Sequence, residues 1–215
     1  MFRSPNSKVK RKLHLTTTFR FQLGEEDGTV YGNPSSSPEK KTIHYMRWVR
    51  YVLDNFATVA EAVEAMKSLI TVNNNLCPGF TEDSQGLELG AHMAIEDATG
   101  DSAVFEHVAG QLQIYHSRTD ALVLTNEPPF DQHVEILSQY EPWGGNISLP
   151  DNLPGSVDSS DRFIRLEYYL QHTPEPETEA QAIANVLSLI SATNVPFGAP
   201  YGGKFQVGNQ QRCNV

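Results

Sequence analysis

The fold is decided by the sequence HMAIEDATGDSAVFEH, residues 92–107. Apolar and polar residues alternate along it with a period of two, which is the pattern of a half-buried β-strand. The alternation breaks at Thr99, Gly100 and Asp101, residue types that favour a tight turn. These residues therefore predict two antiparallel strands joined by a short turn.

The same alternation continues beyond the turn and predicts a longer meander. We expect four strands separated by short turns, at about residues 91–97, 102–108, 111–117 and 121–126. Ala94, Val104 and Ile114 are then available for the core faces of this sheet. The last strand carries Asn126 to its end.

Helical periodicity precedes the predicted sheet. Residues 43–55 repeat apolar side chains at helical spacing, and a capping box formed by Thr58 and Glu61 opens a second helix. We expect these two helices to pack as an antiparallel pair. The polar residues 73–90 predict a loop between the second helix and the sheet.

Helical periodicity also follows the predicted sheet. One helix is expected at residues 130–140, and a second is capped by Ser160 or Asp161. A third is capped by Thr178. The apolar side chains of this third helix are Ile183, Val186, Leu187 and Ile190. Helices before and after an antiparallel sheet place the chain in the α+β class.

Composition limits the partners that the chain can have. Its 215 residues carry a formal net charge of −10, and five basic residues among the first twelve leave the remainder strongly acidic. Because an acidic surface repels a phosphate backbone, we expect no nucleic-acid partner. No run approaches the roughly 18 apolar residues of a membrane-spanning helix, so we expect no membrane partner. A homo-oligomer is compatible with the sequence.

Metal and cofactor chemistry is not indicated by the sequence. Cys77 and Cys213 are the only cysteines, and the seven histidines lack the spacing of a zinc motif. We therefore expect no metal site and no cofactor. Cys77 precedes Pro78 in the predicted polar loop, so we interpret it as an ordinary loop cysteine.

Three segments are predicted along the chain. Residues 1–42 carry weak periodicity and the loop-forming sequence YGNPSSSP (31–38), so we expect a poorly ordered or divergent segment. Residues 43–200 form the predicted domain. Residues 201–215 are rich in Gly and Gln and are expected to form a divergent tail.

Short motifs inside the predicted domain carry a resemblance to a known family. In chain order they are AIED (94–97), GDSA (100–103), TNEP (125–128), LPG (153–155) and DRF (161–163). With these motifs the domain resembles, in part, the choloylglycine hydrolase and penicillin V acylase family of N-terminal-nucleophile amidases. The resemblance implies the four-layer αββα sandwich of N-terminal-nucleophile hydrolases, here without its first strands. It also implies a small-molecule amide substrate, such as penicillin V or a conjugated bile salt.

The resemblance implies roles for two residues. Family chemistry uses an N-terminal cysteine, whose thiol is the nucleophile and whose free α-amine is the base. Asn126 matches the asparagine that stabilises the oxyanion, and Arg162 matches an arginine that favours the thiolate. Arg165 lies one turn later and is the other arginine that could be assigned to this position.

Both residues also have a simpler interpretation. The sequence TNEP is by itself an ordinary turn, in which asparagine tolerates a left-handed backbone. Arg162 could pair with Asp158 or Asp161 in the first turn of a helix. Histidines of this region are interpreted as surface or satisfied core residues rather than as acids or bases: His92, His107, His116 and His133.

The first residues of the sequence depart from the family pattern. The chain begins with Met1 and Phe2, and removal of methionine requires a small second residue, so no cysteine becomes residue one. We therefore expect this chain to be inactive as an amidase. The alternatives are a non-catalytic remnant that acts as a binding or interaction module, and a truncated chain without a stable fold.

Overall fold

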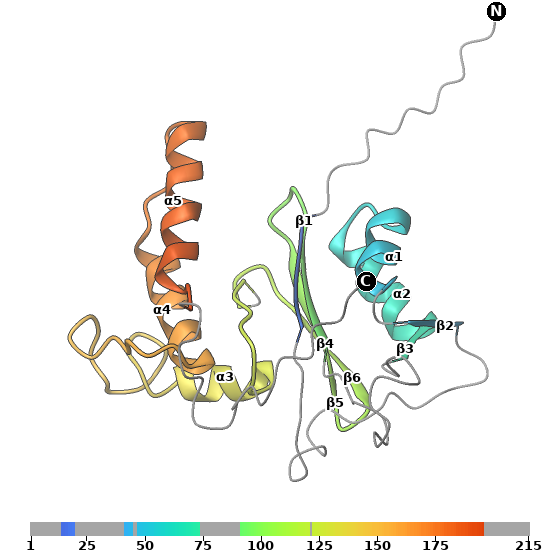
Figure 1. Ribbon diagram of the computed structural model, residues 1–215, viewed down its shortest axis with the longest axis horizontal. Coiled ribbons are helices and arrows are strands. Elements are labelled where there is room, and N and C mark those ends of the chain that lie inside the picture. Colours follow the sequence, from blue (N-terminus) through green and yellow to red (C-terminus); the bar gives the residue numbers. More distant parts are fainter. Residues whose placement is uncertain (1–13, 20–40, 45–46, 74–90, 121, 196–215) are drawn as a thin grey trace, which may run out of the picture. The chain divides into compact units, whose positions relative to one another are not determined.

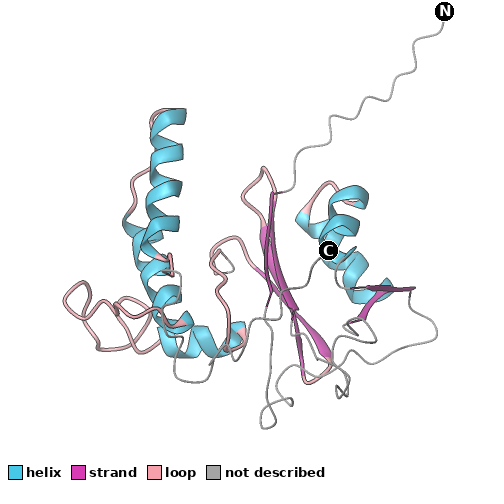
Figure 2. Ribbon diagram, viewed as in Figure 1, coloured by secondary structure: helices cyan, strands magenta, loops and turns pink. Residues whose placement is uncertain are grey.

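The computed structural model describes residues 14–19, 41–44, 47–73, 91–120 and 122–195. Contacts divide the chain into two units, residues 1–129 and 130–215, and each unit is described by itself (Figure 1). The described residues form six strands and five helices (Figure 2). In the first unit these are β1 (His14–Phe19), β2 (Lys41–His44), α1 (Trp48–Asn55), α2 (Val59–Leu69), β3 (Ile70–Asn73), β4 (Ala91–Glu96), β5 (Ser102–Val108) and β6 (Gln111–His116). In the second unit they are α3 (Phe130–Leu137), α4 (Ser159–His172) and α5 (Glu179–Ala192).

A four-stranded antiparallel sheet forms the centre of the first unit, with the strand order β1-β4-β5-β6. The turn from β4 to β5 contains Gly100, whose positive φ of 76° is open to glycine without a steric penalty. Two residues join β5 to β6, Ala109 at φ 49° and Gly110 at φ 75°, as a type I′ turn requires. The predicted meander is therefore confirmed for its first three strands.

The strand predicted at residues 121–126 is wrong. Residues 122–129 form a loop before α3, and β6 is an edge of the sheet that the structure describes. Pro128 and Pro129, at the end of this loop, lack the N–H that a strand ladder needs. The fourth strand is instead β1, which comes from a segment predicted to have little order and pairs with β4 along its whole length.

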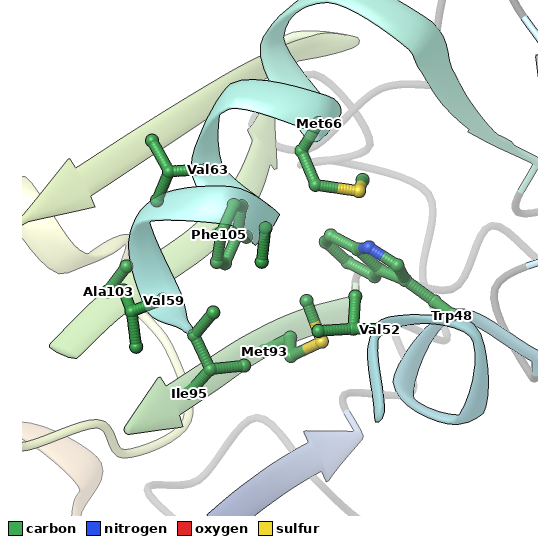
Figure 3. Close-up of a cluster of buried hydrophobic side chains, with 10 residues drawn as sticks. Trp48, Val52, Val59, Val63, Met66, Met93, Ile95, Ala103 and Phe105 are labelled. Atoms are coloured by element: carbon green, nitrogen blue, oxygen red, sulfur yellow. The ribbon is translucent and has the colours of Figure 1, made fainter. Parts of the chain in front are cut away.

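Helices α1 and α2 cover one face of this sheet (Figure 1). Because side chains alternate along a strand, every second residue of β4 and β5 faces these helices. Trp48 packs edge-on against Phe105, with ring centroids 6.1 Å apart. Full burial of an aliphatic or aromatic side chain stabilises the fold by roughly 1.5–3 kcal/mol. The buried cluster, shown in Figure 3, consists of Trp48, Val52, Val59, Ala62, Val63, Met66, Met93, Ile95, Ala103 and Phe105.

The expected core positions are divided between the two faces of the sheet. Ile114 packs against the cluster under the helices. Val104 is fully buried, but it lies between Ala103 and Phe105 and therefore points to the opposite face. Half-buried Ala94 is the register partner of Val104 and shares that face. The sheet is thus buried on both sides along β5.

Both helices expected before the sheet are present. Helix α1 begins at Trp48 and not at residue 43, because Lys41–His44 form β2, which pairs in parallel with β3. Helix α2 begins with the predicted capping box, in which the backbone N–H of Glu61 donates to Oγ1 of Thr58 at 3.2 Å.

Asp97 connects the β4–β5 turn to the start of α2. One carboxylate oxygen accepts from the backbone N–H of Val59 at 3.0 Å, and the other accepts from the N–H and hydroxyl of Thr99 at 2.8 and 2.6 Å. Burial acts to raise the pKa of Asp97, but hydrogen bonds from Thr99, Val59 and Asp101 outweigh it and lower the pKa. Asp97 is therefore ionised while it caps the helix.

Helices α3 and α5 of the second unit lie where they were predicted from the sequence. Helix α5 begins at its predicted cap, since the backbone N–H of Gln181 donates to Oγ1 of Thr178 at 3.2 Å. Helix α3 ends at Leu137, before the predicted end at residue 140. The apolar face of α5 is exposed, with each of its large side chains more than half accessible: Ile183, Val186, Leu187 and Ile190.

Helix α4 begins earlier than predicted. Its first residue is Ser159 and its N-cap is Asp158, so the predicted caps Ser160 and Asp161 are wrong. The carboxylate of Asp161 accepts from the backbone N–H of Ser156 at 3.0 Å. Asp161 therefore holds the preceding loop against the first turn of the helix.

Some predictions concern features that the described residues do not decide. The tail at residues 201–215, Cys77 and Cys213 lie outside the described residues. The segment boundaries at residues 42 and 200 and the antiparallel arrangement of α1 and α2 stay predictions. In the part of the chain that the structure describes, no helix has the length and apolar character needed to cross a membrane.

Candidate functional site

Asn126 lies in the loop between β6 and α3, and not at a strand end as predicted. Its neighbours Val123 and Thr125 are each 3 % exposed, which fixes this loop to the protein interior. Asn126 itself is half-buried. A half-buried amide on an anchored loop can meet a small ligand with little reorganisation, which is the property of an oxyanion donor.

Arg162 lies in the first turn of α4 and is 8 % exposed. Its backbone N–H donates to the carbonyl of Asp158 at 3.0 Å, and its Nε donates to the carbonyl of Val157 at 3.0 Å. The side chain is therefore folded back over the start of the helix. Since a guanidinium stays protonated at any working pH, this turn holds a positioned positive charge.

Arg165, the other candidate of the same helix, donates hydrogen bonds to three backbone carbonyls. Its Nη1 donates to Pro154 at 2.7 Å and to Ser156 at 2.9 Å, and its Nε donates to Ala192 at 3.2 Å. These hydrogen bonds join the loop before α4 to the last residue of α5. These contacts give Arg165 a structural role, and the assignment of Arg162 as the site residue stays a prediction.

The two predicted site residues belong to different units. Asn126 lies within residues 1–129 and Arg162 within residues 130–215. The structure therefore describes the surroundings of each one by itself.

A buried carboxylate–imidazole pair spans the β4–β5 hairpin. His92 is 3 % exposed and Glu106 is fully buried, and Nδ1 of His92 lies 3.2 Å from Oε1 of Glu106. The two are register partners across the hairpin. This pair was not predicted from the sequence, although a turn centred on Thr99 places residues 92 and 106 opposite one another.

His107 is buried on the face of the sheet that α1 covers. Its ring lies 5.7 Å from the ring of Trp48, centroid to centroid. Among the described residues, neither Nδ1 of His107 nor Nε1 of Trp48 has a hydrogen-bond partner. Burial lowers the pKa of His107 from 6.5 to about 4, so the imidazole is neutral at physiological pH. His107 is therefore a core residue, one of the two interpretations given for it, and its Nδ1 has no hydrogen-bond partner among the described residues.

A third buried histidine contacts the helix that carries Arg162. His133 of α3 is completely buried, and its Nε2 lies 3.5 Å from Oγ of Ser159. Its ring stacks on Phe163 with the centroids 4.7 Å apart and the planes 7° from parallel. Nothing in the sequence pattern marks this contact, because residues 133 and 159 lie on separate helices.

Metal ligands are not grouped in the described residues, where no set of three or more His, Cys, Asp or Glu side chains could hold an ion. Three acidic side chains are buried among the described residues, Asp97, Glu106 and Glu167, and the first two have the protein partners given above. The chemistry that these side chains offer is hydrogen bonding.

These features agree with a comparison with known families. The family model for linear amide C-N hydrolases, choloylglycine hydrolase family, matches residues 28–208, which include both Asn126 and Arg162. The chain belongs to this family. The family predicted from the sequence motifs is confirmed.

Individual relatives lead to the same family. The chain is 30% identical to the penicillin V acylase of Pectobacterium atrosepticum over 182 residues, covering 78% of this chain and 46% of the relative. It is 29% identical to a bile salt hydrolase/transferase of Bifidobacterium longum over 166 residues, covering 69% and 49%. The solved penicillin V acylase from Agrobacterium tumefaciens is similar in structure, with a TM-score of 0.64, 29% identity and coverage of 88% of this chain and 52% of that one. The chain thus spans about half the length of the relatives that it matches.

Proposed function

We propose that this chain forms part of a hydrolase of linear amide bonds, of the penicillin V acylase or bile salt hydrolase type. The observation that carries the proposal is the family match over residues 28–208. The proposed substrate is a small molecule in which an acyl group is joined to an amine. The proposed fold is the αββα sandwich, supported by a sheet with helices over one face and by a separate group of helices.

Asn126 is the proposed oxyanion donor. Attack on an amide carbonyl moves negative charge onto its oxygen, and a donor fixed beforehand stabilises that charge without further ordering. The loop of Asn126 meets this requirement, because the residues on its N-terminal side are anchored in the interior.

Arg162 is the proposed partner of the nucleophilic thiolate that the family resemblance implies. A nearby guanidinium favours thiolate over thiol by Coulomb attraction. The helix itself does not favour the placement, since the N-terminal turn carries the positive end of the helix dipole. A buried cation at this position therefore supports a role toward an anionic group.

The test is an amidase assay on a polypeptide in which this sequence follows an N-terminal cysteine and the strands that the family fold implies. We expect hydrolysis of penicillin V or of a glycine-conjugated bile salt, with the 215-residue chain alone assayed beside it. Far-ultraviolet circular dichroism establishes that each protein is folded. A folded polypeptide that cleaves neither substrate would contradict the proposal.

A non-catalytic interaction module is the second candidate. The observation that favours it is the exposed apolar face of α5, because exposed contiguous apolar surface commonly marks an interaction site. Hydrolysis in the assay above, abolished by replacing the N-terminal cysteine with alanine, would exclude this candidate.

A further inference from the structure

We propose that His133 is a positioning residue that holds Arg162 in place through the first turn of α4. The inference rests on the proposed function only where it treats Arg162 as a site residue. His133 lies on α3 and Arg162 on α4, and both belong to the second unit.

His133 contacts α4 on both sides of Arg162. Three residues before Arg162, the hydroxyl of Ser159 lies 3.5 Å from Nε2 of the imidazole. One residue after it, the ring of Phe163 lies parallel to the imidazole at 4.7 Å. Phe130, also on α3, packs edge-on against Phe163 at 6.0 Å. A single side chain thus bridges two points of the turn that carries Arg162.

Because Ser159, Arg162 and Phe163 share one turn of the helix, the contacts of His133 also hold Arg162 in position. Residues three and four apart lie on the same side of a helix, so Ser159 faces the same way as Arg162 and Phe163. The Nε of Arg162 donates to Val157, which precedes the N-cap of the helix. The hydrogen bond therefore depends on how the first turn is rotated and packed against the loop before it.

The chemistry of His133 suits this role better than an apolar side chain would. The flat imidazole fills the space against Phe163, while its nitrogen gives Ser159 a polar contact where water is excluded. Ser159 is 6 % exposed, and a buried hydroxyl that loses a partner is destabilised by the full cost of its desolvation. These two contacts fix the distance of the first turn of α4 from α3 and the rotation of that turn about the helix axis.

Arg165 provides an internal control on the same helix. Its Nε donates to Ala192 of α5, and neither Ser159 nor His133 takes part in its hydrogen bonds to Pro154, Ser156 and Ala192. A change that only weakens the fold would loosen both arginines. A change that releases the positioning contact would loosen Arg162 alone.

The experiment measures hydrogen exchange at the Nε–H groups of both arginines by nuclear magnetic resonance, in the full chain labelled with ¹⁵N-arginine. Arg162→Lys and Arg165→Lys assign the two signals. In Ser159→Ala, we expect exchange at Arg162 to become roughly fivefold to tenfold faster, the factor for one hydrogen bond, while exchange at Arg165 is unchanged. Ser159→Thr keeps a hydroxyl and should restore slow exchange.

His133→Phe repeats the test from the other side of the contact. It keeps a stacked ring and removes Nε2, the nitrogen that lies against Ser159. Ser159→Ala adds no bulk and introduces a good helix former, so it carries the test even if His133→Phe does not fold. Unchanged exchange at Arg162, or equal acceleration at Arg162 and Arg165, would overturn the proposal. The exchange experiment measures no activity. An amidase assay that gives no product would therefore contradict the proposed function without contradicting the positioning role of His133.

Discussion

Glu106 lies directly across the β4–β5 hairpin from His92, and the two side chains meet at 3.2 Å inside the protein. Both are buried on the face of the sheet opposite the cluster that α1 and α2 cover. A carboxyl group in such a place needs a partner, because an uncompensated polar group away from water is costly. The pair therefore makes the hairpin sensitive to substitution at either residue.

We expect Glu106→Ala to lower the free energy of unfolding by about 3 kcal/mol, since it leaves His92 without this partner and opens a cavity. Glu96→Ala, at an exposed position of β4, is the matched control and should change stability by less than about 0.5 kcal/mol. Urea unfolding followed by circular dichroism measures both. Equal effects of the two substitutions would show that the buried pair is not a stability determinant.

His107 makes stability depend on pH. Its pKa is lowered from 6.5 to about 4 in the folded protein, so the unfolded chain binds the additional proton between these values. The contribution of His107 to the free energy of unfolding is therefore fully present above about pH 6.5. It is lost as the pH drops toward 4, by about 3 kcal/mol in total. Urea unfolding at several pH values should show this slope, and His107→Leu should remove it. The exposed His172 supplies the control: His172→Leu should leave the slope as it is.

Asn126 should matter for the rate of the chemical step. In a polypeptide that carries an N-terminal cysteine, we expect Asn126→Ala to reduce kcat by about 10²–10³, the usual loss for one oxyanion donor. Asn152→Ala is the control, because Asn152 is exposed and its amide donates to the backbone of Ser148 at 2.9 Å. Steady-state kinetics on penicillin V would show whether Asn126 has been assigned correctly, since a kcat within twofold of the parent would remove it from the site.

The two arginines of α4 should respond differently to the same conservative change. Arg162→Lys should lower kcat/KM by about tenfold or more, since an ammonium does not reproduce the planar fork of donors. Arg165→Lys should instead lower stability, by about 1–2 kcal/mol, because it breaks hydrogen bonds to three carbonyls. Kinetics and urea unfolding on both variants separate these outcomes, and the reverse pattern would exchange the roles of the two residues.

Local patterns explain which parts of the fold could be predicted. The period of two and the residue types at Thr99–Asp101 predicted β4 and β5, and the caps at Thr58 and Thr178 predicted the starts of α2 and α5. Strand β1 was not predicted, because its partner β4 is distant in sequence and its own pattern is weak. Residues 122–126 have strand-like alternation but follow the edge strand, so pairing and not pattern decided their structure.

The site shows the same division between local pattern and tertiary contact. The motifs around Asn126 and Arg162 were visible in the sequence, and so was the ambiguity between Arg162 and Arg165. The carbonyls that accept from Arg165 come from the loop before α4 and from the end of α5, so its structural contacts could not be predicted from the sequence. The contact between His133 and Ser159 likewise depends on how two helices pack, which no periodicity within one helix reveals.

The turn between β5 and β6 shows that the sequence is not optimal for its own backbone. Ala109 has a φ of 49°, a region in which an alanine is strained and in which asparagine before glycine is favoured. Ala109→Asn should therefore raise the melting temperature by a few degrees, equivalent to about 1 kcal/mol, as differential scanning calorimetry would measure. The hairpin forms its register in spite of this residue, so a more thermostable version of the chain can be sought at the exposed Ala109, which is distant in sequence from Asn126 and Arg162.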